Sequence, residues 1–429
     1  MSQTKRFVLL AGAALSLGSV NAALAQQSTS PDEVRAVVAE MLSDAESRSS
    51  LLADAGHDSK GFMISGEGFT LRVGGQLQFR YLMNFRDDDN TVGARPGDDF
   101  EPGFQTARTR LGARGNIISN DWTYVVQGNF SQDGGTFGLE DAYVEYKLPN
   151  GLRIRWGQFK LPLLREELVD DPYQLAVERS VMNSIFTQGR SQGVAFLCNS
   201  SWCNTGLAFS DGLNSANTDF TAPGGAALAP VGEADWAVTG RIEFLFAGAK
   251  KDLRDFTSPR GAPLGAMLGL AGHYQQSPNS DNTGDIDREL FEYTADMTLE
   301  GGGWNLFGAF VGRWDKFRNG GVDADFNDFG GLVQGGIRVA PNTEIFARWD
   351  AVFLDSDRGV TEDNFHFITA GFNQYIAGSA IRFTADVVCA LTETPDLVGL
   401  GALPNTGIGL LGDTDSGEIV GRLQFQLMF

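Results

Sequence analysis

The sequence lacks features that several large protein classes require. Beyond residue 20, no segment approaches the ~20 consecutive apolar residues of a membrane-spanning helix, which argues against a helical membrane protein. A net charge of −21 argues against binding of nucleic acid, because nucleic-acid-binding proteins carry basic patches. Only three His residues occur, and no G-x-S-x-G with a His and an acid around it and no phosphate-binding glycine loop is found. We therefore expect that the protein is not an enzyme.

Cysteine is also scarce, with three residues in the whole chain. Cys198 and Cys203 flank a tight turn, where a disulfide is plausible in an oxidising compartment; two free thiols are the alternative. A zinc site is poorly supported, because no His or second Cys pair lies nearby in sequence. We expect no metal and no cofactor.

The N-terminus has the three parts of a secretory signal peptide. Lys5 and Arg6 precede an apolar run from Phe7 to Val20, and Ala23-Leu24-Ala25 supplies the small residues of a cleavage site. Residues 1–25 are therefore predicted to be removed, and the mature chain is predicted to leave the cytoplasm.

A short helix is predicted to follow, over residues 31–56. Ser30 can cap it, Pro31 suits its first turn and Glu33 completes a capping box. Apolar residues from Val34 to Leu52 fall roughly on one face. The segment is either a short coiled coil that helps three subunits meet or a loosely held amphipathic helix.

From Phe69 onward, apolar and polar residues alternate over strands of about ten residues, which is typical of a membrane barrel. In the strand 69–86, Leu77 and Phe79 can face lipid while Arg80 faces the other way, and Gly74-Gly75 suggests a bend or bulge. Arg facing hydrocarbon costs about 2–4 kcal/mol near the midplane, so the arginines are predicted to line a wet interior. Residues 62–429 are therefore predicted to be all-β, forming a transmembrane antiparallel β-barrel.

About sixteen strands can be counted, an even number as single-chain bacterial barrels require. The predicted strands are 69–86, 105–117, 121–131, 139–148, 151–160, 192–198, 204–211, 235–246, 265–276, 288–300, 303–316, 328–340, 342–354, 364–377, 379–391 and 417–429. Their connections alternate between short turns and longer loops, as expected for short periplasmic turns opposite long outer loops. The connection 247–264 breaks this rule, and a missed strand pair or a misplaced boundary there is one explanation. In the strand 303–316, two sets of apolar residues compete for the lipid face.

The most specific pattern lies between residues 100 and 195. Gly157-Gln158-Phe159-Lys160-x-Pro162, the pair Glu166-Glu167 and the run Glu178-Arg179-Ser180 resemble the phosphate-selective porin O and P family. The resemblance implies a sixteen-stranded trimeric channel whose third outer loop folds into the lumen. By our strand count, residues 161–191 form the third outer loop.

Basic side chains on this loop and the nearby strands are predicted to form an anion pathway, because rings of Arg or Lys build anion-selective pores. The predicted pore-lining residues are Arg72, Arg80, Arg108, Arg110, Arg114, Arg153, Arg155, Lys160, Arg165, Arg179 and Arg190. The predicted opposing acidic wall comprises Asp141, Glu145, Glu166 and Glu167.

These features together predict an outer-membrane porin, a passive water-filled channel for small hydrophilic solutes that could prefer anions such as phosphate. The alternating C-terminal strand that ends in Phe429 resembles the signal that the barrel-assembly machinery recognises. The expected partners are therefore that machinery, outer-membrane lipid, two further copies of the chain and small solutes or inorganic anions. A structural protein that links the outer membrane to the cell wall through residues 31–56 is the alternative.

Overall fold

The structure is a computed structural model, and it describes residues 61–87, 98–132, 134–218, 234–277, 287–319, 322–400, 402–403 and 406–429. The predicted signal peptide and the whole of the predicted helix 31–56 belong to residues 1–60, which lie outside the described residues. Among the described residues, no helix is long and apolar enough to cross a membrane.

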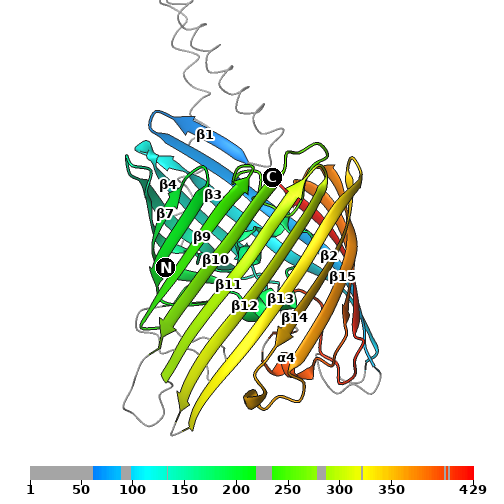
Figure 1. Cartoon of the computed structure of the whole chain (residues 1–429). Helices are drawn as coiled ribbons and strands as arrows, with labels where there is room; N and C mark the ends of the chain where they lie inside the picture. Colours follow the sequence, from blue (N-terminus) through cyan, green and yellow to red (C-terminus); the bar gives the residue numbers. More distant parts are fainter. Residues whose placement is uncertain are drawn as a thin grey trace, which may run out of the picture. The chain divides into compact units, whose positions relative to one another are not determined.

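Antiparallel strands close into a barrel (Figure 1). The strands are β1 (Phe62–Gly66), β2 (Phe69–Phe85), β3 (Phe100–Ile117), β4 (Ser119–Phe130), β5 (Phe137–Lys147), β6 (Arg153–Lys160), β7 (Arg190–Asn199), β8 (Cys203–Ser210), β9 (Trp236–Ala247), β10 (Gly265–Gln276), β11 (Asp287–Gly301), β12 (Trp304–Asn319), β13 (Val322–Ala340), β14 (Thr343–Phe353), β15 (Asn364–Ala377), β16 (Ile381–Ala390) and β17 (Ile419–Met428). Each strand from β2 to β17 pairs with the next, and β17 pairs with β2. This ring of sixteen strands confirms the predicted barrel.

The one strand that the alternation did not predict is β1, which forms a short hairpin with β2. Phe62 lies opposite Val73, whereas the last residue of β17 lies opposite Gln76. β1 and β17 therefore follow each other along the same edge of β2.

The register of β2 against β3 corrects one detail. The shift lies between Gln78 and Phe79 of β2, where Ala107 is the extra residue of β3, and the register is regular at Gly74-Gly75. Gly75 instead pairs with the C-terminus, because its amide donates to the carbonyl oxygen of Phe429 at 2.8 Å. A Cβ on Gly75 would lie 2.5 Å from the Phe429 ring, so only glycine fits this contact.

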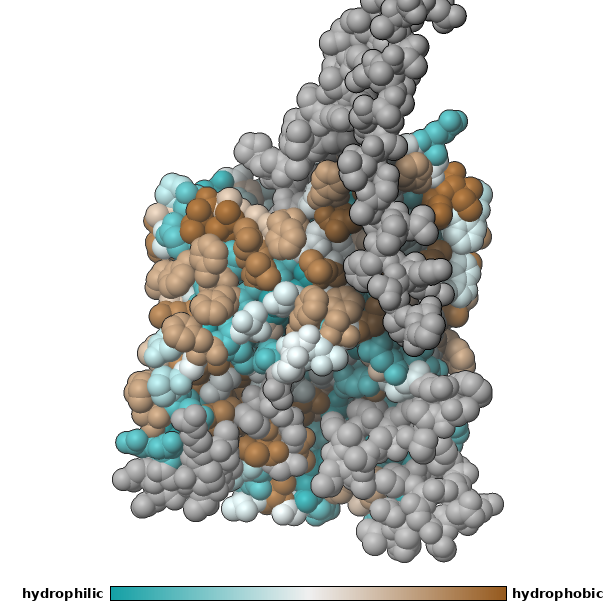
Figure 2. Space-filling view, turned by 180° about the vertical axis from the view of Figure 1, so that it is seen from behind, coloured by the Kyte–Doolittle hydropathy of each residue, from teal (hydrophilic) through white to brown (hydrophobic). Residues whose placement is uncertain are grey.

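The alternation along each strand separates a lipid-facing surface from the interior. On β2, Leu77 and Phe79 are 39% and 49% exposed. Gln78, which lies between them, and Arg80, which follows Phe79, are buried. Figure 2 shows apolar residues spread over the outer face of one side of the barrel. Exposure also shows which apolar residues of β12 face lipid: Phe310 faces outward, and Phe307 and Val311 face inward.

We call the two ends of the barrel the turn end and the loop end. The turn end carries the connections at 118, 148–152, 200–202, 248–264, 302–303, 341–342 and 378–380, together with β1 and Phe429. The loop end carries the connections that the sequence predicted to be outer loops. Leu161–Gly189, which joins β6 to β7 and which we call the inner loop, contains the short helices α2 (Arg165–Leu168), η1 (Asp171–Tyr173) and α3 (Val181–Phe186).

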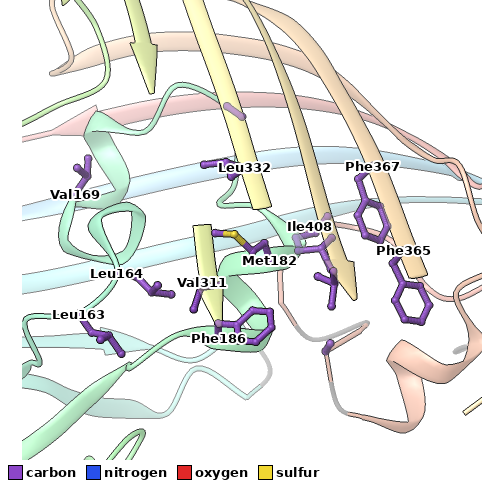
Figure 3. Packing of buried hydrophobic residues seen from close by; sticks show 14 of the residues in the cluster. Leu163, Leu164, Val169, Met182, Phe186, Val311, Leu332, Phe365, Phe367 and Ile408 are labelled. Carbon is purple, nitrogen blue, oxygen red and sulfur yellow. The ribbon is translucent and has the colours of Figure 1, made fainter. Parts of the chain in front are cut away.

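Part of the barrel interior is filled by apolar side chains, which is unexpected for a wet lumen. Residues of the inner loop form one buried cluster with residues of β12, β13 and β15, as Figure 3 shows for Met182, Val311, Leu332 and Phe367. The loop-end connection between β16 and β17 joins this cluster through Ile408. The inner loop therefore folds into the barrel, as the family resemblance implied.

Candidate functional site

The inner loop is held on one side by apolar packing against β12 to β15. Phe186, Met182 and Leu164 of the loop are at most 2% exposed. The strand β13 permits this close approach because Gly330 has no side chain, and a Cβ there would lie 2.6 Å from Cγ of Met182. These contacts explain why β12 has apolar residues on both faces: its outer face meets lipid and its inner face meets the loop.

Polar side chains of β14 to β17 hold the backbone of the inner loop. Asp350 accepts from the amide of Val181 at 3.0 Å, and Asp386 accepts from the amide of Val177 at 2.9 Å. Further donors are directed at the loop carbonyl groups: Arg348 to Glu178 at 2.9 Å, Arg382 to Gln174 at 2.8 Å, and Asn373 to Leu175 at 2.9 Å. Buried backbone groups need such partners, so these strands fix the path of the loop.

Ion pairs hold the opposite side of the loop to β2 and β3. Glu178 accepts from Arg80 at 2.8 Å and from Arg108 at 2.7 Å. Asp171 pairs with Arg108 at 3.2 Å and also with Arg110. Although burial alone would raise it, the pKa of Asp171 is held well below its usual value, first by Arg108 and then by Arg110. Three of the predicted pore-lining arginines are thus neutralised by the inner loop.

The predicted acidic residues of the loop have different partners. Glu166 is buried and accepts from the amide of Ser180 at 2.9 Å and from its hydroxyl at 2.5 Å, and burial raises its pKa. Glu167 pairs with Arg179 at 3.3 Å and with Lys160 at 3.5 Å. Burial alone would raise the pKa of Glu167, but these two cations lower it. Both carboxylates therefore stabilise the loop from within.

The remaining predicted acids do not form a wall opposite the arginines. Glu145 of β5 lies directly across from Arg155 of β6 and pairs with it at 2.8 Å and with Arg153 at 3.0 Å. Asp141 pairs with Arg190 at 2.9 Å. The expected opposition across the pore is corrected to pairing between neighbouring strands, because adjacent strands bring opposite charges closer than the lumen does.

A cavity of about 940 Å³ lies at the turn end of the barrel. Nine cationic side chains line it, against three carboxylates. The cations are Arg72, Arg114, Arg153, Arg155, Lys160, Arg165, Arg241, Lys250 and Arg254, and the carboxylates are Asp170, Glu243 and Asp255. A second cavity of about 360 Å³ shares Arg72, Arg114, Arg155 and Lys160 with the first and extends along β2 to β5 as far as Arg110.

Two of these cations face each other. Arg72 and Arg114 occupy directly opposite positions on β2 and β3, an arrangement that is unfavourable for like charges. Within the described part of the chain, neither guanidinium forms an ion pair. Arg165 is buried, yet it donates only to the backbone carbonyl of Leu253. Within the described residues, none of these three guanidinium groups forms an ion pair with a carboxylate.

The structure thus divides the eleven predicted basic residues. Six of them line the turn-end cavity: Arg72, Arg114, Arg153, Arg155, Lys160 and Arg165. Of these six, Arg153, Arg155 and Lys160 also pair with acids of β5 or of the inner loop. The others, Arg80, Arg108, Arg110, Arg179 and Arg190, do not line this cavity and form ion pairs with acids of the inner loop or of β5. Sequence reasoning missed Arg241 of the cavity, although its alternation with outward-facing Val238 could have identified it.

The predicted disulfide is wrong, because Cys198 and Cys203 are free cysteines. In the register of β7 and β8, Cys198 lies opposite Thr205, which places Cys203 at a diagonal position. Diagonal neighbours are about 7–8 Å apart, which exceeds the Cα separation of most disulfides.

Two comparisons with known proteins agree with this architecture. Residues 76–227 match the family model described as phosphate-selective porin O and P. An anion-selective porin from Comamonas acidovorans superposes with a TM-score of 0.57 at 14% identity, over 84% of this chain and 100% of that one. The outer membrane channel DcaP of Acinetobacter baumannii superposes with a TM-score of 0.57 at 12% identity, over 86% and 99% of the two chains. OmpF of Salmonella typhi gives 0.54 at 12% identity, over 86% and 100%.

At these identities, the structural likeness shows the fold alone. A comparison with curated proteins found no matching sequence.

Proposed function

We propose that the chain, whose residues 76–227 match the phosphate-selective porin O and P family, is an outer-membrane porin that conducts small hydrophilic anions in preference to cations. In this proposal, a solute passes beside the inner loop and through the turn-end cavity. The observation that supports it is that four of the nine cations around that cavity, Arg72, Arg114, Arg165 and Arg254, form no ion pair within the described residues. Guanidinium groups in a confined channel attract anions and can bind phosphate or carboxylate bidentately.

The proposal assigns ion preference to the cations that lack a carboxylate partner. An ion pair has little remaining field, because the two charges largely cancel beyond a short distance. Arg72 and Arg114 keep their full charge at the cavity wall. Their unfavourable cross-strand placement is explained if anions occupy the space between them.

The test is the reversal potential of the purified protein in a planar lipid bilayer under a KCl gradient. We expect the wild type to prefer chloride, and we expect Arg72→Gln/Arg114→Gln to shift the preference toward potassium. Lys147→Gln/Lys251→Gln is the matched control, because it removes two exposed charges near the same end that do not line the cavity. An equal reversal potential in wild type and Arg72→Gln/Arg114→Gln would contradict the proposal.

Addition of phosphate distinguishes a specific from a general channel. Block of the chloride current at low phosphate concentration would support phosphate binding in the cavity. Unblocked current would indicate a general preference for anions. If no channels form at all, the alternative of a structural protein that links the membrane to the cell wall through residues 31–56 is favoured.

We further propose that the mature protein lacks residues 1–25, forms a trimer and is inserted through recognition of its last strand. Phe429 supports the last point, because its backbone pairs with Gly75 while its side chain is 49% exposed. Mass spectrometry of the mature N-terminus, the mass of the native oligomer, and membrane insertion of a chain with Phe429→Ser test these three points.

A further inference from the structure

The connection between β9 and β10 is a long segment at the end where the other connections are short. Residues 248–264, which we call the turn-end segment, form neither a strand nor a helix. Gly248 and Gly261 both have positive φ, at 76° and 80°, so the chain can turn sharply near each end of the segment. In Figure 1, the segment is a green loop beyond the ends of β10 to β13.

The middle of the turn-end segment packs into the barrel against the inner loop. Leu253 and Phe256 are 1% and 2% exposed. The ring of Phe256 lies 4.6 Å from that of Phe307 on β12, and its amide donates to the carbonyl oxygen of Tyr173 in the inner loop at 3.3 Å. Arg165 of the inner loop donates to the carbonyl oxygen of Leu253. Segments from the two ends of the barrel therefore meet inside it.

The far side of the segment is held by a buried polar network. Thr257 donates to Glu344 of β14 at 3.0 Å and accepts from Arg338 of β13 at 2.9 Å. Glu344 also accepts from the hydroxyl of Tyr375 at 2.5 Å. Arg260 donates to the carbonyl oxygen of Arg338 at 2.9 Å, so the segment crosses from β9 to β13. The turn-end segment is therefore anchored at both sides.

From these contacts, we infer that the turn-end segment is a second constriction of the pore, which narrows its turn end beside the inner loop and exposes Arg254 to the passing anion. Lys250, Lys251 and Arg254 are all exposed, but only Lys250 and Arg254 line the turn-end cavity, and Lys250 pairs with Glu243 at 3.1 Å. The inference rests on the proposed function, since it concerns the same path.

The first experiment replaces residues 250–262 by the two-residue turn Asn-Gly and measures single-channel conductance in KCl. Asn-Gly suits a tight connection between antiparallel strands. We expect conductance to rise by about twofold, since pore diameter and lining groups set the flow through a channel. Unchanged conductance in a folded variant would overturn the second constriction and leave the proposed porin intact. A wild type that conducts nothing would overturn both.

The second experiment compares two single substitutions, in case the replacement prevents folding. Arg254→Gln and Lys251→Gln remove the same charge three residues apart in one segment. If the segment lines the path, Arg254→Gln lowers the chloride preference and Lys251→Gln leaves it unchanged. Equal reversal potentials in the two variants would overturn the inference.

Discussion

Arginine is abundant in two regions of the barrel. One is the contact of the inner loop with β2 and β3, and the other is the turn-end cavity. The arginines have different partners in the two regions. At the contact, Arg80, Arg108 and Arg110 each pair with Glu178 or Asp171. At the cavity, Arg72 and Arg114 belong to the same two strands and have no such pair within the described residues. A few residues along a strand therefore separate arginines that position the loop from arginines that can act on a solute.

The difference follows from burial. A buried guanidinium costs several kcal/mol to desolvate, and a carboxylate in good geometry is the usual compensation. At the cavity, water replaces the carboxylate, so the charge can remain unpaired. The number of inward-facing arginines is thus a poor guide to selectivity unless their partners are known.

The largest effect is expected when the ion pairs at the loop contact are broken. Glu178→Gln leaves Arg80 and Arg108 buried without this carboxylate, and removal of one partner of a buried pair typically costs about 3–5 kcal/mol. We expect a corresponding loss in the free energy of unfolding, or local release of the inner loop. Urea unfolding in detergent and proteolysis of the loop measure the two effects.

Asp170→Asn is the control for this substitution. It removes one negative charge from the same loop, but the Asp170 side chain is 69% exposed and pairs only with Lys160, at 3.4 Å. We expect it to change stability by less than about 1 kcal/mol. Similar losses for both variants would contradict the view that Glu178 anchors the loop through buried charges.

The apolar side of the loop gives the second prediction. Met182→Ala removes a side chain that is 1% exposed between α3 and β13, and such truncations cost about 2–5 kcal/mol. Met297→Ala is the matched control, because Met297 is 42% exposed on the lipid-facing side of β11. Thermal unfolding in detergent should separate the two variants, and equal shifts would contradict a docked apolar face.

The sequence predicted the strands well and the partners of the charges poorly. Sixteen strands follow from alternation, which depends only on which face of each strand meets lipid. The pairing of Arg108 with Glu178 could not be predicted in this way, because it depends on how a loop seventy residues away folds into the barrel. The partner of Glu145 was easier to predict, because Arg155 lies directly across from it on the next strand.

The turn-end segment and β1 show the limit of the same reasoning. In the sequence, residues 248–264 differ from the other turn-end connections only in length. Their burial could not be predicted, because Leu253 and Phe256 belong to no alternating apolar pattern. β1 contains five residues and pairs with one strand. Alternation over so few residues is too short to predict a strand. Their placement depends on tertiary contacts with Tyr173 and with the first residues of β2.

The smallest predicted effect concerns the pH dependence of the turn-end segment. Burial raises the pKa of Asp255 to about 6, from an ordinary value of 3.8. Glu344 also raises it, whereas Arg254 and Arg165 lower it, and Glu300 is a further acid nearby. Since the docked segment binds this proton more tightly than the undocked one, docking is strongest below about pH 4 and weakens as the pH rises to about 6.

Trypsin provides the measurement, because Lys250, Lys251 and Arg254 are cleavage sites within the segment. We expect the cleavage rate of the wild type, divided by that of Asp255→Asn at the same pH, to rise several-fold between pH 5 and pH 7. Division by the variant removes the pH dependence of the protease. The effect is modest because Asp255 is partly exposed, and solvent screens its charge. A ratio that stays constant would mean that Asp255 does not control docking of the turn-end segment.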